Sequence, residues 1–387
     1  MTVLDDRDFR ATLMSKDIPL ANIHGRRIEP LQEHLLPLQL QRMGDIETWL
    51  SMRAIDEHRV NSRLLKKVLR LEEKDNVSTA LKFNGATITD TYWVRPWNSN
   101  LRWDQVRFTS NYFDTLALRG DLSAFSQRPS RTPELTNTGS FEKCWRLENG
   151  EWWMYKAGNE YEQFSELFIE QLGCQLGFPM AHYELSGGYI KTRDFTSGAT
   201  VNFEPAFGLV GDNEDYVHNY RVFQNISQDL ADQYFEIILM DTVCLNADRH
   251  TNNYGVLRNP DTGKILCLAP NFDNNIALIS RGYNSTPRKP DIFGDDLRTL
   301  QNETNAAGLY AARHPLPVVT ASVIDRAYAA TGMQADLNYL RQFVLTGYQQ
   351  TPIVQMATAL SQLPLPVPCK RSSAAPTPSD FQLSTPQ

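Results

Sequence analysis

Three polar side chains in one stretch of the chain have the types and the order of a site that handles phosphate and a divalent metal ion. Asp248 lies in a polar turn, Asn253 follows it five residues later, and Asp273 comes after a predicted hairpin. Carboxylate and amide oxygens are hard ligands, which suit Mg²⁺ bound beside phosphate oxygens and water. The stretch therefore predicts magnesium-dependent chemistry on a phosphate group.

The same order of residues occurs in protein kinases. In those enzymes an Asp of the catalytic loop is followed by an Asn that holds a metal ion, and an Asp after the next hairpin holds both ions. An Asp and an Asn at the spacing of Asp248 and Asn253 also occur together by chance in ordinary loops. The kinase-like interpretation therefore depends on Asp273 and on the elements around the three residues.

The elements expected around this stretch would bring the three side chains together. A helix is predicted before Asp248, because apolar residues recur there three to four positions apart: Leu230, Tyr234, Ile237, Ile238 and Val243. Residues 255–257 and 265–268 are predicted strands of a hairpin around the turn 259–263. The hairpin returns the chain to the polar turn, and Asp273 lies just past it.

A lysine and a glutamate upstream have the order of a second kinase feature. Residues 141–147 and 152–157 are predicted strands of a hairpin, and Lys156 lies near the end of the second. An amphipathic helix is predicted over 162–176, with Glu166 beside its apolar face. A strand lysine is usually a solvated edge residue, but in kinases it holds the α- and β-phosphates and a helix glutamate fixes it.

The turn before this hairpin contains Gly139 and Ser140. In the kinase-like interpretation the backbone N–H groups of this loop would cover the phosphates. The loop has a single glycine, Gly139, and no GxGxxG pattern, so by itself it is a weak signal.

Composition narrows the class of protein. The 387 residues are 41% hydrophobic, which is enough for a sizeable core, and the net charge of −7 disfavours direct nucleic-acid binding. The five cysteines are scattered without a CxxC pair, and the N-terminus is too polar for a signal peptide. The longest apolar stretch, residues 235–245, is short and interrupted by Asp241. We expect a cytoplasmic protein with no structural zinc site and no membrane span.

The patterns along the chain predict four regions. Residues 1–80 are expected to form a mixed, partly helical N-terminal region, and residues 81–192 a β-rich N-lobe with the nucleotide-binding loop. Residues 193–363 are expected to form a helical C-lobe with the catalytic and metal-binding residues. The tail 364–387 is rich in Pro, Ser and Thr, and its composition predicts disorder.

Four further elements are predicted within these regions. Helices are expected over 45–58 and 62–71, and the second has a basic side that an ordinary solvated helix face explains best. A hairpin is expected over 182–191, before the connection between the lobes. A polar loop is expected over 281–296, in the position of a kinase activation loop.

The chain resembles the HipA-like family of bacterial Ser/Thr kinases, in its prophage-type or standalone branch. The most specific matching stretch is the sequence Asn-Ala-Asp-Arg-His-Thr-Asn-Asn-Tyr-Gly over residues 246–255. The other matches are residues 88–94, Thr138, Gly139, Ser140, Lys143, Trp145, residues 155–157, Glu166 and residues 269–273. Together they cover about residues 88–280, and the first 80 residues match less clearly.

The resemblance implies an α+β, two-lobed protein-kinase-like fold that uses ATP and Mg²⁺. It implies Asp248 as the general base, Asn253 and Asp273 as Mg²⁺ ligands, and Lys156 as the phosphate anchor. In related proteins a serine of the phosphate-covering loop is autophosphorylated, which ejects the loop and inactivates the enzyme, and Ser140 is the matching residue. Some relatives are toxins that pair with a helix-turn-helix antitoxin, so an antitoxin-type partner is a candidate here. The protein substrate cannot be read from the sequence.

Three other functions compete with a kinase. A catalytically inactive nucleotide-binding regulatory module would keep Lys156 and Asp273, but the chain also has Asp248 and Asn253. A metal-dependent phosphohydrolase using Asp248, His250 and Asp273 would need more ligands, and none of the seven histidines is spaced as a metal pair. A lone His250 is more often structural. A DNA-binding regulator using the basic helix is disfavoured by the net charge.

Overall fold

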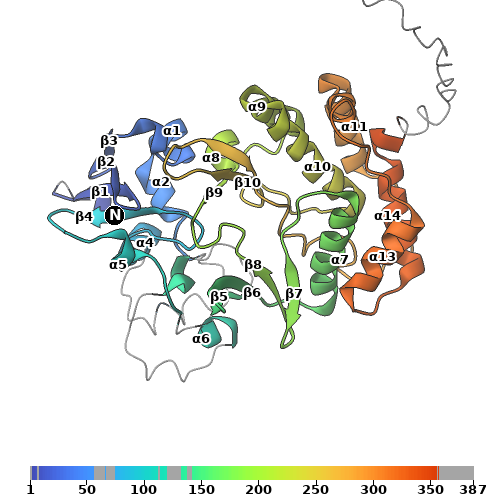
Figure 1. Ribbon diagram of the computed structural model, residues 1–387, viewed down its shortest axis with the longest axis horizontal. Coiled ribbons are helices and arrows are strands. Elements are labelled where there is room, and N and C mark those ends of the chain that lie inside the picture. Colours follow the sequence, from blue (N-terminus) through green and yellow to red (C-terminus); the bar gives the residue numbers. More distant parts are fainter. Residues whose placement is uncertain are drawn as a thin grey trace, which may run out of the picture.

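The computed structural model describes residues 2–6, 8–55, 66, 75–111, 114–119, 132–136, 142–354 and 356 (Figure 1). Gly139, Ser140, the tail 364–387 and all of the predicted helix 62–71 except Lys66 lie outside the described residues. In Figure 1 a first sheet (blue) lies at one end of the molecule, a helical region (orange) lies at the other, and strands β9 and β10 lie between them.

The first sheet is antiparallel, with the strand order β3-β2-β1-β4. Its strands are β1 (Arg10–Ser15), β2 (Ile18–His24), β3 (Arg27–Pro30) and β4 (Tyr92–Pro96). Short helices α1 (Leu38–Met43), α2 (Ile46–Ser51) and α4 (Asn76–Lys82) pack against it around a common apolar core. Asp45 caps the start of α2, because its side chain accepts hydrogen bonds from the backbone N–H groups of Glu47 and Thr48.

The second sheet is the β-rich part of the predicted N-lobe, with the strand order β5-β6-β8-β7. Its strands are β5 (Lys143–Glu148), β6 (Glu151–Lys156), β7 (Tyr183–Ser186) and β8 (Tyr189–Arg193), which confirm both predicted hairpins. Helix α7 (Glu160–Leu176) begins at Asn159 with a capping box and ends at Gly177 in a left-handed conformation. Short helices η4 (Pro133–Thr136), α5 (Trp103–Val106) and α6 (Asp114–Arg119) precede this sheet in the chain.

The C-terminal region is built around helix α10 (Gln228–Cys244), most of whose residues are buried. Ser227 caps its first turn, and the apolar residues that predicted the helix lie in the largest core. The helices around it are α8 (Phe207–Val210), α9 (Tyr216–Ile226), α11 (Ile292–Thr304), α12 (Ala306–Ala311), α13 (Ala321–Thr331) and α14 (Leu337–Gln349). In the described part of the chain, no helix combines the length and the apolar character needed to cross a membrane.

A third, small sheet lies beside the predicted catalytic stretch. It has the order β11-β10-β9 and contains β9 (Asn202–Pro205), β10 (Gly255–Arg258) and β11 (Ile265–Leu268). The predicted hairpin 255–268 is therefore confirmed. The polar loop predicted over 281–296 is too long, because α11 already begins at Ile292, where Leu297 and Leu300 supply the buried face of the helix.

Candidate functional site

Lys156, Glu166 and Asp273 meet between the second sheet and the loop after β11. Lys156 is the last residue of β6, and its Nζ donates to Glu166 Oε1 at 3.3 Å and to Asp273 Oδ1. Glu166 lies on the buried face of α7, and its Oε2 accepts a hydrogen bond of 2.8 Å from the backbone N–H of Asn274. Glu166 therefore fixes both the lysine and the backbone that carries Asp273.

The charges of this trio depend on one another. Burial alone would lower the pKa of Lys156, but the carboxylates of Asp273 and Glu166 outweigh it and raise the pKa to about 12. Burial alone would raise the pKa of Asp273, but Lys156 outweighs it and lowers the pKa to about 2. Burial raises the pKa of Glu166, and the nearby Asp273 carboxylate adds to this effect. A cationic lysine thus holds Asp273 as a carboxylate.

Asp273 lies in a backbone conformation that non-glycine residues rarely adopt, with a φ of 61°. Its N–H donates to the hydroxyl of Tyr183 on β7 at 3.0 Å. The unusual conformation is thus held in place by a side chain of the second sheet and by the bond from Asn274 to Glu166. Tyr183 has no signal in the sequence beyond an aromatic residue in a predicted strand.

The loop after α10 presents Asp248 and Asn253 through local hydrogen bonds. The N–H of Asp248 donates to Asn246 Oδ1 at 3.1 Å, and Asn253 Nδ2 donates to the carbonyl oxygen of Asp248 at 2.7 Å. The second bond sets the orientation of the amide, so Asn253 Oδ1 is the atom that could bind a metal ion. The side chain of Asp248 is exposed, while Asn253 is buried.

His250 has a structural position in this loop. Its Nδ1 accepts a hydrogen bond of 3.2 Å from the N–H of Asn252, and its carbonyl oxygen accepts one of 2.8 Å from the N–H of Asn253. Among the described residues, which include Asp248, His250 and Asp273, no three His, Cys, Asp or Glu side chains are grouped so that they could share a metal ion. The metal-ligand set of the phosphohydrolase interpretation is therefore not assembled.

Arg249 joins the two loops, and sequence reasoning missed it. Its Nη1 donates to the carbonyl oxygens of Asn253 at 2.7 Å and of Phe272 at 2.6 Å. Its Nε and Nη2 each donate at 3.0 Å to the carboxylate of Asp241, a buried residue of α10. Nη2 also donates to the side-chain oxygens of Asn271 and Asn274. One guanidinium thus holds the Asp248–Asn253 loop against the segment that ends in Asp273.

The sequence did carry a signal for this junction. Asp241 interrupts an otherwise apolar helix, and a buried carboxylate requires a cationic or hydrogen-bonding partner. Burial raises the pKa of Asp241, and Arg249 opposes that effect. Arg249, in the polar turn that follows the helix, is the cationic residue that meets this requirement.

Of the residues predicted to act, the structure brings Lys156, Glu166 and Asp273 into direct contact. Asp248 and Asn253 form a second group, which Arg249 connects to the first. The donor set fits a magnesium ion bound to phosphates, because Asn253 and Asp273 supply an amide oxygen and a carboxylate and leave other positions to phosphate and water.

Comparisons with known proteins identify the fold. No protein-family model matches the chain, and no curated protein matches its sequence. HipA of Shewanella oneidensis MR-1, solved with HipB and operator DNA, is similar in structure, with a TM-score of 0.54, 10% identity, and coverage of 88% of this chain and 96% of that chain. The proinflammatory kinase CtkA of Helicobacter pylori gives a TM-score of 0.40 at 15% identity, covering 57% of this chain and 95% of that chain. The likeness to the HipA structure shows that the chain has the HipA-like, two-lobed α+β fold expected from the resemblance.

Proposed function

We propose that this protein is an ATP- and Mg²⁺-dependent serine/threonine protein kinase of HipA-like type. The observation that carries the proposal is the contact of Lys156 with Glu166 and Asp273, next to the loop of Asp248 and Asn253. Kinases need these groups: a lysine for the phosphates, a glutamate that fixes it, and two oxygen ligands for the metal ion.

In this proposal the chain positions charge and does little covalent chemistry itself. Lys156 is held as a cation, so it can bind the phosphate oxygens of ATP. Asn253 and Asp273 would hold Mg²⁺, which, when bound, neutralises negative charge on the phosphates. Glu166 and Arg249 keep these groups in place through buried hydrogen bonds.

Asp248 is proposed as the group that accepts the hydroxyl proton of the substrate. It is exposed, so a serine or threonine of another protein can reach it. Its backbone N–H and carbonyl oxygen are hydrogen-bonded to the side chains of Asn246 and Asn253, which hold the residue beside the proposed metal ligand Asn253. A positioned base of this kind contributes about 10²- to 10⁴-fold to a reaction rate.

The proposal is tested by incubating the purified protein with γ-labelled ATP and Mg²⁺ and by mapping phosphorylated residues with mass spectrometry. Mg²⁺-dependent transfer to serine or threonine is expected, and chelation of the metal ion should stop it. ATP binding without any transfer would favour the nucleotide-binding module instead. Absence of both binding and transfer would contradict the proposal.

The regulation and partner that we propose follow from the resemblance to HipA-like kinases. Ser140 is proposed as an inhibitory autophosphorylation site, because it precedes the hairpin that carries Lys156. The similar structure contains HipA with HipB and operator DNA, so we propose an antitoxin-type partner for this chain and a role as a toxin. The proposed partner is tested by co-expressing the chain with a small DNA-binding protein encoded next to it and by asking whether the two purify as a complex.

A further inference from the structure

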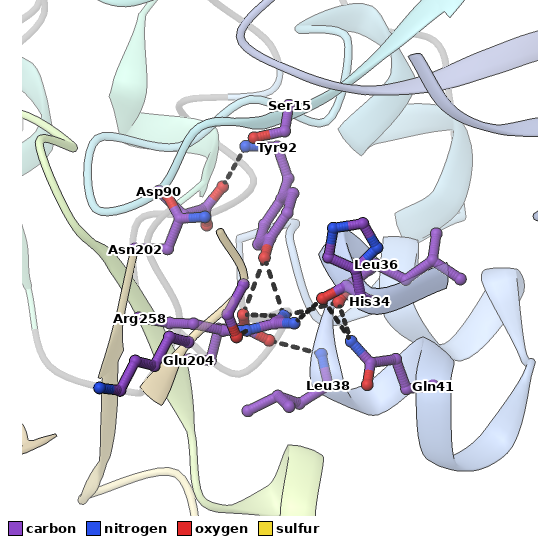
Figure 2. Close-up of polar contacts among 12 residues, drawn as sticks. Ser15, His34, Leu36, Leu38, Gln41, Asp90, Tyr92, Asn202, Glu204 and Arg258 are labelled. Atoms are coloured by element: carbon purple, nitrogen blue, oxygen red, sulfur yellow. Dashed lines mark hydrogen bonds and ion pairs between the residues drawn. The ribbon is translucent and has the colours of Figure 1, made fainter. Parts of the chain in front are cut away.

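A buried cluster of polar side chains joins the N-terminal sheet to the small sheet of β9, β10 and β11 (Figure 2). The small sheet lies beside the loop of residues 246–254, which carries Asp248 and Asn253 and is called the catalytic loop below. Its centre is the pair Arg258 and Glu204, from β10 and β9, whose Nη1 and Oε1 atoms lie 3.0 Å apart. The hydroxyl of Tyr92, on β4 of the N-terminal sheet, donates to the same Glu204 oxygen at 2.8 Å. All three residues are buried.

Arg258 makes most of its other hydrogen bonds to the N-terminal part of the chain. Its Nη1 donates to the carbonyl oxygen of Leu36 at 2.6 Å, and its Nη2 donates to that of His34. Its Nε donates to the carbonyl oxygen of Gly263, in the turn between β10 and β11, at 2.5 Å. The guanidinium is therefore satisfied only while residues 34–36 lie against the β10–β11 hairpin.

Glu204 and Arg42 join helix α1 to β9 and to the segment that follows it. Glu204 Oε2 accepts a hydrogen bond of 2.6 Å from the N–H of Leu38, at the start of α1. Arg42, also on α1, donates to the carbonyl oxygens of Phe207 at 2.9 Å and of Gly208 at 3.1 Å. Helix α1 is thus fixed to β9 and to the start of α8.

From there a short backbone path leads to the catalytic loop. The N–H of Phe207 donates to the carbonyl oxygen of Thr251, and the N–H of Ala206 donates to that of Tyr254, both at 2.9 Å. Thr251 lies between Asp248 and Asn253. Strands β9 and β10 also approach closely at Gly255, where an added Cβ would lie 2.2 Å from the carbonyl oxygen of Glu204. A shift of β9 would therefore move the loop.

We infer that Arg258 and Glu204 are positioning residues, through which the N-terminal sheet and α1 set the geometry of the catalytic loop. The inference rests on the proposed function for its catalytic consequence. Neither residue is proposed to touch ATP or substrate. Buried charged groups that lose a partner carry a large desolvation penalty, so the cluster has one favourable arrangement, and that arrangement includes the N-terminal region.

The test compares hydrogen exchange and kinetics in Arg258→Met and in the milder variant Glu204→Gln. Peptides covering residues 202–210 and 246–254 should exchange about tenfold faster or more than in the wild type, because the bonds of Phe207 and Ala206 open more often. In phosphoryl transfer kcat should fall about tenfold, and KM for ATP should change less than kcat, since Lys156 and Asp273 are untouched and only Asn253 of the ATP and metal site lies in the loop.

The matched control is Arg53→Met. Arg53 is also buried and ion-paired, with Asp90 in the N-terminal part of the chain. It donates to the backbone carbonyl oxygen of Tyr92 at 3.2 Å, but the pair makes no hydrogen bond to the described residues of β9 or β10. This variant should lose stability without faster exchange over residues 246–254 and without a change in kcat at a temperature where it is folded.

Each outcome decides the inference. If Arg258→Met does not fold, Glu204→Gln decides, because it keeps the shape of the side chain. Unchanged exchange over residues 246–254 in the folded variants would overturn the inference, and so would equal effects of the Arg53→Met control. If the wild type transfers no phosphate, the proposed kinase function fails, but the exchange measurement still tests the coupling.

Discussion

Replacing Arg249 with methionine should be one of the most damaging single changes in the protein. The variant removes the cation that pairs with Asp241, a residue that is only 1% exposed. It also removes the N–H groups that donate to the carbonyl oxygens of Asn253 and Phe272. Breaking a buried ion pair by removing one partner costs about 3–5 kcal/mol, because an uncompensated charge stays buried. We expect Arg249→Met to lower the free energy of unfolding by about that amount.

A second substitution separates the two causes of this loss. In the double variant Asp241→Asn with Arg249→Met the buried charge is gone, so part of the stability should return. The lost bonds to Asn253 and Phe272 remain lost, and phosphoryl transfer should stay impaired. Urea unfolding of the wild type, both single variants and the double variant measures the coupling between the two residues.

The pH dependence gives an independent check. Burial raises the pKa of Asp241, and Arg249 opposes this effect, so removing the arginine should raise the pKa further. When the pKa of a carboxyl group is higher in the folded than in the unfolded protein, the folded state binds the proton more tightly. The free energy of unfolding then falls as pH rises from the unfolded pKa to the folded pKa. Arg249→Met should therefore be less damaging at pH 5 than at pH 8. A loss below about 1 kcal/mol at pH 8, or one independent of pH, would refute the reasoning.

Three further predictions concern the site itself. Asp273→Ala should abolish the Mg²⁺ dependence of ATP binding measured by calorimetry, and equal Mg²⁺-dependent binding would exclude the metal role. Lys156 lowers the pKa of Asp273 to about 2, so the ionised Asp273 carboxylate should stabilise the folded protein above its ordinary pKa near 3.8, and this stabilisation should be lost as pH falls towards 2. The urea midpoints of wild type and Asp273→Asn should therefore converge in acid. A difference that stays constant with pH would contradict this. Mass spectrometry should find phosphate on Ser140 after incubation with ATP, with weaker ATP binding afterwards, because in the proposed kinase this loop would cover the nucleotide phosphates and the added negative charge would repel them; unchanged affinity would exclude Ser140 as the switch.

Local patterns in the sequence predict the elements that carry the site. The apolar spacing before Asp248 predicts α10, the strand patterns at 141–157 and 255–268 predict two hairpins, and Glu166 lies in a helix as expected. Each of these patterns is decided by neighbours in the chain, through periodicity and turn chemistry.

The contacts between distant segments were not predictable in this way. Strand β4 pairs with β1 across more than 75 residues, for example Tyr92 with Ser15, and no local pattern specifies that pairing. Arg249 also donates to the backbone carbonyl oxygens of Asn253 and Phe272, and the hydroxyl of Tyr183 accepts from the backbone N–H of Asp273; backbone partners of this kind leave no mark in a sequence. In the sequence Arg258 has no feature that distinguishes it from an ordinary residue at the end of a strand. Its role is visible only in the structure, where it is buried and donates to the carbonyl oxygen of Leu36 in the N-terminal region.

The measurement that tests the central claim most directly compares wild type with Asp248→Asn in one set of samples. Calorimetry should give the same affinity for ATP with Mg²⁺, because Asp248 is exposed and is not proposed as a metal ligand. Transfer of labelled phosphate to serine or threonine should fall about 10²- to 10⁴-fold. Transfer within a few-fold of wild type, at equal ATP binding, would contradict the account of this site as a kinase active site.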